Sequence, residues 1–467
     1  MLDWSLSSLR RSWQDMTAAT RVRLTGNVRP DLPEDDLARI RRQIGDCLEG
    51  RGGEVSRRAR AADLGRTYLN LNSEGRRRFL QLLASDYGVD QAALGTAVAA
   101  WQELEPEAGL SARFAAEARL REALTAPRVQ LLAQFNELPR GVQFLVDLRA
   151  ELRGLIHEDA ALKGLDADLK ALFISWFDPG FLELRRITWD ASAALIEKLA
   201  RYEAVHRIRS WRDIKHRLAS DRRCYGFFHP QMPDEPLIYV WVALVKGMAD
   251  NVQRLLDVRT PSDDPREADA AIFYSISNAQ RGLAGVSFGN FLIKRVMNDL
   301  LKDFPRLKTF ATLSPIPGLR RWFEEQREAD EPLLLPAEHK SLTALEPRTG
   351  DPEATFLQQL GMDGWHRRPK VVEAVKVPLL RLGARYLTQA RRGEFARDRV
   401  AHFHLSNGAR MERLNWLADT SANGLEQSFG MMINYLYRED HIESNHEAYT
   451  GEGRIVMSSG VKGLARV

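Results

Sequence analysis

A serine held between an apolar run and a pair of prolines is the first residue of this chain with a context suited to chemistry. Ser314 precedes Pro315-Ile-Pro-Gly318, and because proline fixes its own φ and restricts the residue before it, this backbone is stiff and extended. A serine presented rigidly at a strand end can donate a hydrogen bond or relay a proton, or it can simply cap a turn. The Gly-x-Ser-x-Gly elbow of hydrolases does not surround it, so we do not predict a covalent nucleophile.

Two histidines, His402 and His404, form a second candidate. They alternate in a run from Val400 to Leu405 that we predict to be a strand. On a strand both imidazoles would share one face, which suggests a metal, but no cysteine cluster accompanies them. Either imidazole could instead be a general acid or base near neutral pH, or a structural histidine in the core. Periodicity alone leaves these alternatives open.

The third candidate is a glycine-rich stretch, Arg281-Gly-Leu-Ala-Gly-Val-Ser-Phe-Gly289. Glycines allow close approach of the backbone to a ligand, and the start of a following helix favours phosphate. The spacing matches neither the dinucleotide fingerprint nor the P-loop. It is closer to the R/Q-x-x-G-x-G/A loop by which acetyltransferase-like folds hold coenzyme A, although a plain strand-to-helix turn is an equal alternative.

The elements that position these residues change in character near the middle of the chain. Residues 1–205 are predicted to be helical almost throughout, because apolar residues recur at helical spacing in two consecutive stripes. The stripes consist of Leu145, Leu148, Leu152 and Leu155, and of Leu162, Leu165, Leu169, Leu172 and Trp176. From residue 206 onward, branched and aromatic runs predict strands at Pro236–Leu244, Ala271–Ser277, Thr309–Leu313 and Met431–Tyr437. With a predicted helix at Asn290–Leu301 between two of these strands, the second half contains an α/β unit.

Composition sets the class of protein. The 467 residues, 44% hydrophobic and 28% charged, are typical of a globular protein with two or three domains. The 67 basic and 63 acidic residues leave a net charge of only +4. Basic clusters such as Arg57–Arg60 and Arg76–Arg78 are therefore interpreted as solvated helix faces or subunit contacts, and no nucleic-acid partner is predicted.

Two cysteines, Cys47 and Cys224, are too few for a disulfide framework or a thiolate zinc site. No apolar run is long enough to span a bilayer, so no membrane association is expected. The first sixteen residues include Asp3 and Asp15 and lack the apolar core of a secretory signal. We expect a cytoplasmic location.

Taken together, several segments resemble malonyl-CoA decarboxylase. They are HPQMPDEPLIYVWVALVKGMADNVQ from His229, FYSISNAQRGLAGVSFGNFLIKRV from Phe273, FATLSPIPG from Phe310, VAHFHLSNGARMERLNWLADTS from Val400, and the tail from Asn434 to about Gly463. The resemblance implies an α+β enzyme with an N-terminal all-helical domain, residues 1–205, that assembles a dimer or tetramer. It implies that residues 206–467 form an α/β acetyltransferase-like (GNAT-type) catalytic domain.

The implied reaction converts malonyl-CoA to acetyl-CoA and carbon dioxide, without metal, biotin or pyridoxal phosphate, the coenzyme A being carried by the substrate. By the same resemblance Ser314 and His404 are the catalytic pair, and His402 falls outside the family's catalytic position. The coenzyme A loop would comprise Ala284, Gly285, Val286, Ser287, Phe288, Gly289 and Asn290. Asn407 and Tyr449 are added as further polar substrate contacts.

Two other functions remain in competition. An amine or protein acyltransferase would use the same coenzyme A loop, but it would need an acceptor site and a base to deprotonate the acceptor. A non-catalytic helical scaffold that only senses acyl-CoA would bind the thioester without turnover. Product analysis separates all three.

Overall fold

The computed structural model describes residue 13 and residues 28–49, 53–105, 109–286, 288, 292–345 and 350–466. The chain divides into two compact units. The first, which we call the helical unit, comprises Met1–Glu183, Phe228–Leu237 and Gln280–Phe288. The second, the sheet unit, comprises Leu184–Phe227, Ile238–Ala279 and Gly289–Val467. The domain boundary placed at residue 205 from the sequence stays a prediction.

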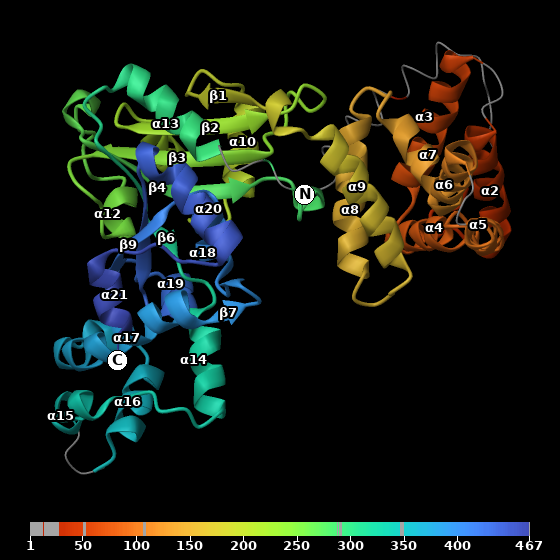
Figure 1. Ribbon diagram of the computed structural model, residues 1–467. Helices are drawn as coiled ribbons and strands as arrows, with labels where there is room; N and C mark the ends of the chain where they lie inside the picture. The colour runs from red at the N-terminus through yellow and green to blue at the C-terminus, as the bar shows by residue number, and fades with distance from the viewer. Residues whose placement is uncertain are drawn as a thin grey trace. The chain divides into compact units, whose positions relative to one another are not determined.

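The helical unit is built from eight described α-helices (Figure 1). They are α2 (Glu34–Leu48), α3 (Glu54–Asn70), α4 (Ser73–Ser85), α5 (Gln91–Gln102), α6 (Leu110–Leu124), α7 (Pro127–Phe135), α8 (Gly141–Leu155) and α9 (Leu162–Trp176). The leucine stripes expected from the sequence face the core, since Leu145, Leu148, Leu152, Leu162, Leu165 and Leu169 are all buried. Helices α8 and α9 pack side by side.

One element departs from the helical prediction for residues 1–205. Helix α9 ends at Trp176, just before Asp178-Pro-Gly180. The short 3-10 helix η1 (Pro179–Phe181) follows, and then strand β1 (Glu183–Ile187). This strand lies at one end of the sheet order and buries only Ile187 fully. A short, largely polar edge strand carries too weak an apolar pattern to be recognised from sequence.

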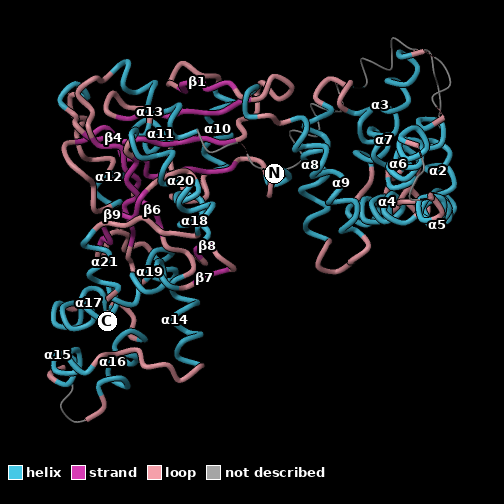
Figure 2. Tube along the Cα trace, viewed as in Figure 1, coloured by secondary structure: helices cyan, strands magenta, loops and turns pink. Residues whose placement is uncertain are grey.

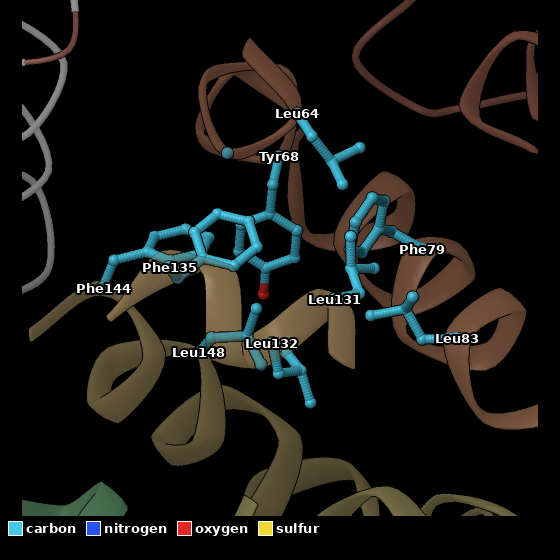
Figure 3. Close-up of a pocket in the computed structure, with 10 residues that line it drawn as sticks. Leu64, Tyr68, Phe79, Leu83, Leu131, Leu132, Phe135, Phe144 and Leu148 are labelled. Atoms are coloured by element: carbon cyan, nitrogen blue, oxygen red, sulfur yellow. The ribbon is translucent and has the colours of Figure 1, made fainter. Parts of the chain in front are cut away.

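An aromatic cluster forms the core of the helical unit. The Phe144 ring stacks on Phe135 with centroids 5.0 Å apart, and the rings of Trp13 and Tyr68 meet its ring at 4.9 and 5.7 Å. Figure 3 shows side chains from four helices converging at this place, and they leave a void of only about 10 Å³. Such a void is too small for a ligand, so this place is packed core rather than a binding site.

The sheet unit contains an eight-stranded mixed sheet (Figure 2). Its strands are β1, β2 (Arg222–Phe228), β3 (Ile238–Val245), β4 (Ala270–Asn278), β5 (Thr309–Thr312), β6 (Ser314–Pro315), β9 (Arg410–Asn415) and β10 (Met432–Tyr437). The order is β1-β2-β3-β4-β5-β10-β6, and β9 also pairs with β10. A separate two-stranded ribbon joins β7 (Arg391–Arg392) to β8 (Phe395–Ala396). The four strands predicted from branched and aromatic runs are therefore confirmed as β3, β4, β5 and β10.

Strands β4 and β5 are parallel, and their pairing ends before β4 does. Their pairing runs from Ala270 opposite Thr309 to Phe273 opposite Thr312, whereas β4 continues to Asn278. Helix α13 (Leu292–Asp303) lies between them in sequence and buries an amphipathic face that includes Val296 and Leu300. The strand, helix, strand order predicted for this segment is thus present, and the described residues between β4 and α13 include the 3-10 helix η3 (Arg281–Leu283).

The sheet unit also contains eleven described α-helices. They are α10 (Ala193–Tyr202), α11 (Trp211–Arg217), α12 (Val252–Leu256), α14 (Leu319–Glu328), α15 (His339–Thr343), α16 (Pro352–Gly361), α17 (Pro369–Gln389), α18 (Arg399–Ser406), α19 (Ala422–Ser428), α20 (Ile442–Glu452) and α21 (Ser459–Ala465). Helices α14 to α17 gather at one end of this unit (Figure 1). Among the described helices, none combines the length and apolar composition needed to cross a bilayer.

The strand predicted for Val400–Leu405 is wrong, because this segment is helix α18. Asp398 precedes it and accepts hydrogen bonds at Oδ1 from the backbone N–H groups of Val400 and Ala401, which is the geometry of a helix N-cap. Gly408, with φ of +79°, provides the left-handed residue just beyond the end of the helix. The period of two between the histidines therefore does not put them on one face.

We expect Phe144→Ala to lower the free energy of unfolding by about 3–5 kcal/mol, because the truncation opens a cavity in a core that has no spare space. Urea unfolding followed by circular dichroism measures this change. Phe181→Ala is the matched control, since Phe181 is 63% exposed, and its cost should stay within about 0.5 kcal/mol. Equal effects in the two variants would contradict the assignment of Phe144 to the core.

Candidate active site

Ser314 lies where the sheet changes partner. It begins β6, two residues after β5 ends, and Ile433 of β10 is opposite it in antiparallel register. Its side chain is buried, and its hydroxyl donates a hydrogen bond to Thr312 Oγ1 at 2.8 Å. Thr312 Oγ1 in turn accepts the backbone N–H of Tyr435 at 3.1 Å. The stiff proline-flanked backbone predicted from sequence thus fixes a serine inside the sheet unit.

His404 reaches Ser314 from helix α18. Its Nε2 is 3.1 Å from Ser314 Oγ, and its Nδ1 is 2.8 Å from the hydroxyl of Tyr437. Both ring nitrogens are therefore engaged, and the side chain is buried. The structure brings together two residues that stand 90 positions apart in the chain.

Two tyrosines of β10 complete the surroundings of His404, and sequence reasoning did not single them out. Tyr435 and Tyr437 are two positions apart on a strand, so they share a face. The Tyr435 ring stacks on the imidazole with centroids 4.5 Å apart and an interplanar angle of 25°. Its hydroxyl is buried and has no hydrogen-bond partner among the described residues. The alternation of the two tyrosines in the predicted strand indicated that they share a face, but it did not indicate that they contact His404.

The network is electrically neutral at ordinary pH. Burial lowers the pKa of His404 to about 3, and no carboxylate of the described residues bonds to the ring to favour an imidazolium. Burial also raises the pKa of Tyr437 well above its usual value, so its hydroxyl keeps its proton. Thr312, Ser314, His404 and Tyr437 form a chain of neutral groups that can each donate or accept a hydrogen bond.

The direction of these bonds defines a tautomer. With Ser314 donating to Thr312, the Ser314 oxygen accepts from His404 Nε2–H, and Nδ1 accepts from the Tyr437 hydroxyl. Reversing every bond gives the other tautomer without creating a charge, because each member has both a donor and an acceptor. A chain with two equivalent directions is suited to passing a proton along its length.

Asp398 connects the two segments that carry the pair. Its Oδ1 caps α18, and its Oδ2 accepts the backbone N–H of Gly318 at 3.3 Å and the Tyr386 hydroxyl at 3.2 Å. Gly318 ends the Ser-Pro-Ile-Pro-Gly segment, so one buried carboxylate fixes this segment relative to the helix that bears His404. Sequence analysis missed Asp398 because its capping role depends on a helix that was predicted to be a strand.

The other residues expected near the substrate have different partners. Asn407 is buried just beyond α18, and its side-chain amide donates to the Phe403 carbonyl at 2.7 Å. The Tyr449 hydroxyl accepts from the Ala396 N–H at 2.9 Å and is 2.9 Å from His402 Nδ1. His402 is exposed and turned away from His404, as expected for helix positions two apart. Substrate contact by Asn407 and Tyr449 remains a prediction.

The glycine-rich loop belongs to the helical unit. The 3-10 helix η3 (Arg281–Leu283) packs against α8 so closely that a Cβ on Gly282 would lie 1.8 Å from the carbonyl oxygen of Val146. Arg149, fully buried on α8, donates through Nη1 to the carbonyls of Gly282 and Ala284 at 2.6 and 3.1 Å. The loop is therefore fixed from its buried side.

Part of the expected coenzyme A loop can be placed in this way. Ala284 and Gly285 are exposed, whereas Val286 and Phe288 are buried, and the Phe288 ring meets that of Phe177 edge to face at 6.3 Å. Ser287, Gly289 and Asn290 lie outside the described residues. Coenzyme A binding by this loop remains a prediction.

A metal centre at the paired histidines does not form. Because α18 is a helix, His402 bonds to Tyr449 and His404 to Ser314 and Tyr437. Across the described part of the chain, no three His, Cys, Asp or Glu side chains are grouped to hold a metal ion.

Comparison with known proteins gives matches over most of the chain. The family model for the malonyl-CoA decarboxylase N-terminal domain matches residues 87–177, and that for the C-terminal domain matches residues 180–467. The mitochondrial malonyl-CoA decarboxylase of Anser anser anser is 38% identical over 420 residues, covering 86% of this chain and 82% of the relative. That of Rattus norvegicus is 35% identical over 448 residues, covering 93% and 87%.

Solved structures agree with these matches. The crystal structure of malonyl-CoA decarboxylase from Rhodopseudomonas palustris superposes with a TM-score of 0.82 at 39% identity, covering 91% of this chain and 99% of that one. The enzyme from Agrobacterium vitis gives a TM-score of 0.81 at 38% identity, covering 92% and 100%.

Asp398→Asn should lower kcat while changing KM little. The amide oxygen can still cap α18, but an NH₂ group at the Oδ2 position would face the Gly318 N–H donor, so the tie to the Ser314 segment is lost. Asp351→Asn is the matched control, because Asp351 caps α16 through the same two types of backbone bond and is exposed. Steady-state kinetics measures both variants, and equal behaviour would remove Asp398 from the positioning of the pair.

Acid should destabilise the native state through His404. An unfolded imidazole binds a proton near pH 6.5, whereas the native one does so near pH 3. The unfolded state therefore binds more protons as the pH falls through 6.5, and stability is lost in that direction. Between pH 7 and pH 5, the free energy of unfolding should fall by on the order of 2 kcal/mol more in wild type than in His404→Asn.

Urea unfolding at the two pH values measures this difference. Ser314→Ala retains the buried imidazole and should keep the acid sensitivity of wild type. If His404→Asn lost as much stability as wild type between these pH values, the native His404 would titrate like an exposed histidine.

Proposed function

Because the chain belongs to the malonyl-CoA decarboxylase family, we propose that Ser314 and His404 form the proton-transferring pair that converts malonyl-CoA to acetyl-CoA and carbon dioxide. The observation that carries this proposal is the neutral hydrogen-bonded chain of Thr312, Ser314, His404 and Tyr437. A decarboxylase must return one proton to carbon, and a chain of donors that can reverse direction performs that transfer. The enzyme class follows from the family, and the roles of individual residues are the proposal.

The chemistry divides into two steps. The bond between the malonyl carboxylate and the methylene carbon breaks, its electron pair passes into the thioester as an enolate, and carbon dioxide leaves. The enolate carbon then takes a proton from the Ser314 hydroxyl, and Ser314 regains one from His404 Nε2–H. As Nε2–H is given up, Nδ1 takes the proton of the Tyr437 hydroxyl, and solvent returns one proton to Tyr437 in each turnover. The neighbouring thioester carbonyl is the electron sink, so the scheme uses no cofactor beyond the coenzyme A of the substrate.

Ser314 is assigned as the group that meets carbon because of how His404 is held. Both imidazole nitrogens are already bonded within the protein, so the proton leaves the network through the serine. Burial of the ring disfavours an imidazolium, and no carboxylate in the described part of the chain bonds to it to offset this. The pair therefore differs from a Ser-His-Asp triad, in which an acid stabilises the charged imidazole during acyl transfer.

The Tyr435 hydroxyl is a candidate donor to the developing enolate oxygen. It is buried and unsatisfied among the described residues, and its ring stacks on His404. A preorganised donor at a growing negative charge stabilises the transition state, and loss of one such donor costs about 3–4 kcal/mol in other enzymes.

The sheet supports an acetyltransferase-like (GNAT-type) interpretation of the catalytic part. Parallel β4 and β5 separate after Phe273 and Thr312, and the glycine-rich loop follows β4. A split between parallel strands leaves backbone groups of β4 open to an extended ligand, which suits the pantetheine arm of coenzyme A.

Assembly of a dimer or tetramer through the helical domain, residues 1–205, is the remaining part of the proposal. Helices α5 and α6 pack on each other and expose large apolar side chains. Trp101, Leu110, Phe114 and Leu124 are between 42% and 72% exposed. Apolar groups gathered on one helical hairpin favour contact with another chain. A cytoplasmic location is likewise kept as part of the proposal.

The test is incubation of purified protein with malonyl-CoA alone, with acetyl-CoA and carbon dioxide followed by chromatography. Wild type should form both in equal amounts. Ser314→Ala and His404→Asn should each lose about 10²- to 10⁴-fold in kcat, the range expected on removing a positioned proton donor. His441→Asn, an exposed histidine outside the network, should keep wild-type kcat.

Other outcomes would point elsewhere. Transfer of the acyl group to an added amine, without release of carbon dioxide, would indicate an acyltransferase. Unchanged malonyl-CoA in the presence of folded protein that binds it would indicate an acyl-CoA sensor. Full activity in Ser314→Ala would remove the serine from the proton path.

A further inference from the structure

We propose that Lys170 of α9 binds the pyrophosphate of coenzyme A together with the backbone N–H of Gly285. The inference rests on the proposed function, because it names the residue of the helical unit that would hold the phosphate part of the substrate. Both groups belong to the helical unit. The residues expected to bind coenzyme A from the sequence do not include Lys170.

The side chain of Lys170 lies directly over the open backbone of Gly285. A Cβ built on Gly285 would be 3.4 Å from both Cε and Nζ of Lys170. Gly285 has φ of +79°, a left-handed conformation that glycine adopts readily and that leaves this face of the loop free of side-chain atoms. Gly285 is exposed and Lys170 half-buried, so a ligand can reach the space beside them from solvent.

The Lys170 ammonium has no carboxylate partner among the described residues, and the reason lies in its neighbours. Asp166, one helical turn earlier, is the acid that would normally pair with it. Its two oxygens are instead held by Arg149 at 2.8 and 3.3 Å, with Arg153 at 3.6 Å from the second. Asp168 is held by Arg128 at 2.6 Å.

The positions one turn later on α9 are Phe173 and Ile174, which carry no charge. Both nearby acids are thus occupied by buried or largely buried arginines. The positive charge of Lys170 is left available for an anion that is not part of the described chain.

The loop has an unused backbone donor at this point. The carbonyls of Gly282 and Ala284 point to Arg149 and are used there. The N–H groups of Ala284 and Val286 bond back to Arg281 and Leu283, whereas the Gly285 N–H donates to no described residue. A free amide beside a free ammonium is a combination that binds a phosphoryl oxygen.

Of the anions on malonyl-CoA, the pyrophosphate is the one that this arrangement favours. The loop directly follows β4, and the donor that it offers is a backbone N–H group, which is a common ligand of phosphate. The malonyl carboxylate and the 3′-phosphate are the competing anions, and substrate analogues separate the three.

The test compares steady-state kinetics on malonyl-CoA and on malonyl-pantetheine, which lacks every phosphate. Lys170→Gln should raise KM for malonyl-CoA about tenfold with kcat nearly unchanged, as expected for loss of one charge-assisted hydrogen bond. Its KM for malonyl-pantetheine should equal that of wild type. Lys170→Arg should restore most of the binding, since it keeps the charge.

The matched control is Lys163→Gln. Lys163 is an exposed lysine on the same face of α9, about 10 Å away along the helix axis. It should leave both KM values unchanged. An equal rise for Lys163→Gln would mean that only the overall positive charge of this surface matters, and it would overturn the proposal.

Titration calorimetry with coenzyme A itself tests the site without any turnover. Lys170→Gln should weaken binding of both coenzyme A and dephospho-coenzyme A about tenfold. A loss confined to coenzyme A would assign Lys170 to the 3′-phosphate and overturn the pyrophosphate assignment. Unchanged binding of both would also overturn it, as would an equal KM rise with malonyl-pantetheine.

This readout is independent of the reaction. If wild type bound coenzyme A in a Lys170-dependent manner yet formed no acetyl-CoA, the proposed catalysis would fail and the phosphate site would stand. If wild type formed acetyl-CoA while Lys170→Gln behaved as wild type, the reverse would hold.

Discussion

The geometry of the candidate site depends on one buried carboxylate, Asp398. Ser314 and His404 lie on separate elements, and the distance between Ser314 Oγ and His404 Nε2 is set by how those elements are held. One oxygen of Asp398 fixes the start of α18, and the other fixes the end of the proline-rich segment. Burial raises the pKa of Asp398, and the hydrogen bonds from backbone N–H groups and the Tyr386 hydroxyl act in the opposite direction, in favour of the carboxylate. Ser314 and His404 are therefore positioned by a residue outside the proposed reacting pair.

Neutrality is the second property of the site. His404 has hydroxyl groups at both nitrogens and an aromatic ring against its face, so burial is not offset by any opposite charge. Such surroundings disfavour an imidazolium but keep the imidazole able to donate and accept. This suits a reaction in which the substrate brings its own negative charge, because that charge moves from a carboxylate to an enolate beside hydroxyl and imidazole groups that are themselves neutral.

At the glycine-rich loop of the helical unit, too, the residues that hold the backbone in place differ from those proposed to bind the ligand. Arg149 and Asp166 form a buried ion pair whose main effect is geometric, since it occupies two loop carbonyls and removes the acid nearest to Lys170. Buried ion pairs add little net stability compared with apolar packing. Here the pair determines which groups remain for a ligand: one ammonium and one amide.

The amino-acid sequence by itself determined the helical first half, the main strands and the stiff backbone around Ser314, because apolar period and proline act locally. It also contained the family resemblance that singled out His404. Only the tertiary structure decided four contacts. They are the contact of the His404 side chain with Ser314, the stacking of Tyr435 on His404, the hydrogen bonds of Asp398 to both segments, and the approach of Lys170 to Gly285. These contacts join residues far apart in the chain, and a local pattern specifies which face a residue occupies but not which distant element will meet that face. The misread segment at Val400–Leu405 has the same origin, since a short apolar run fits either period and the cap at Asp398 decides between them.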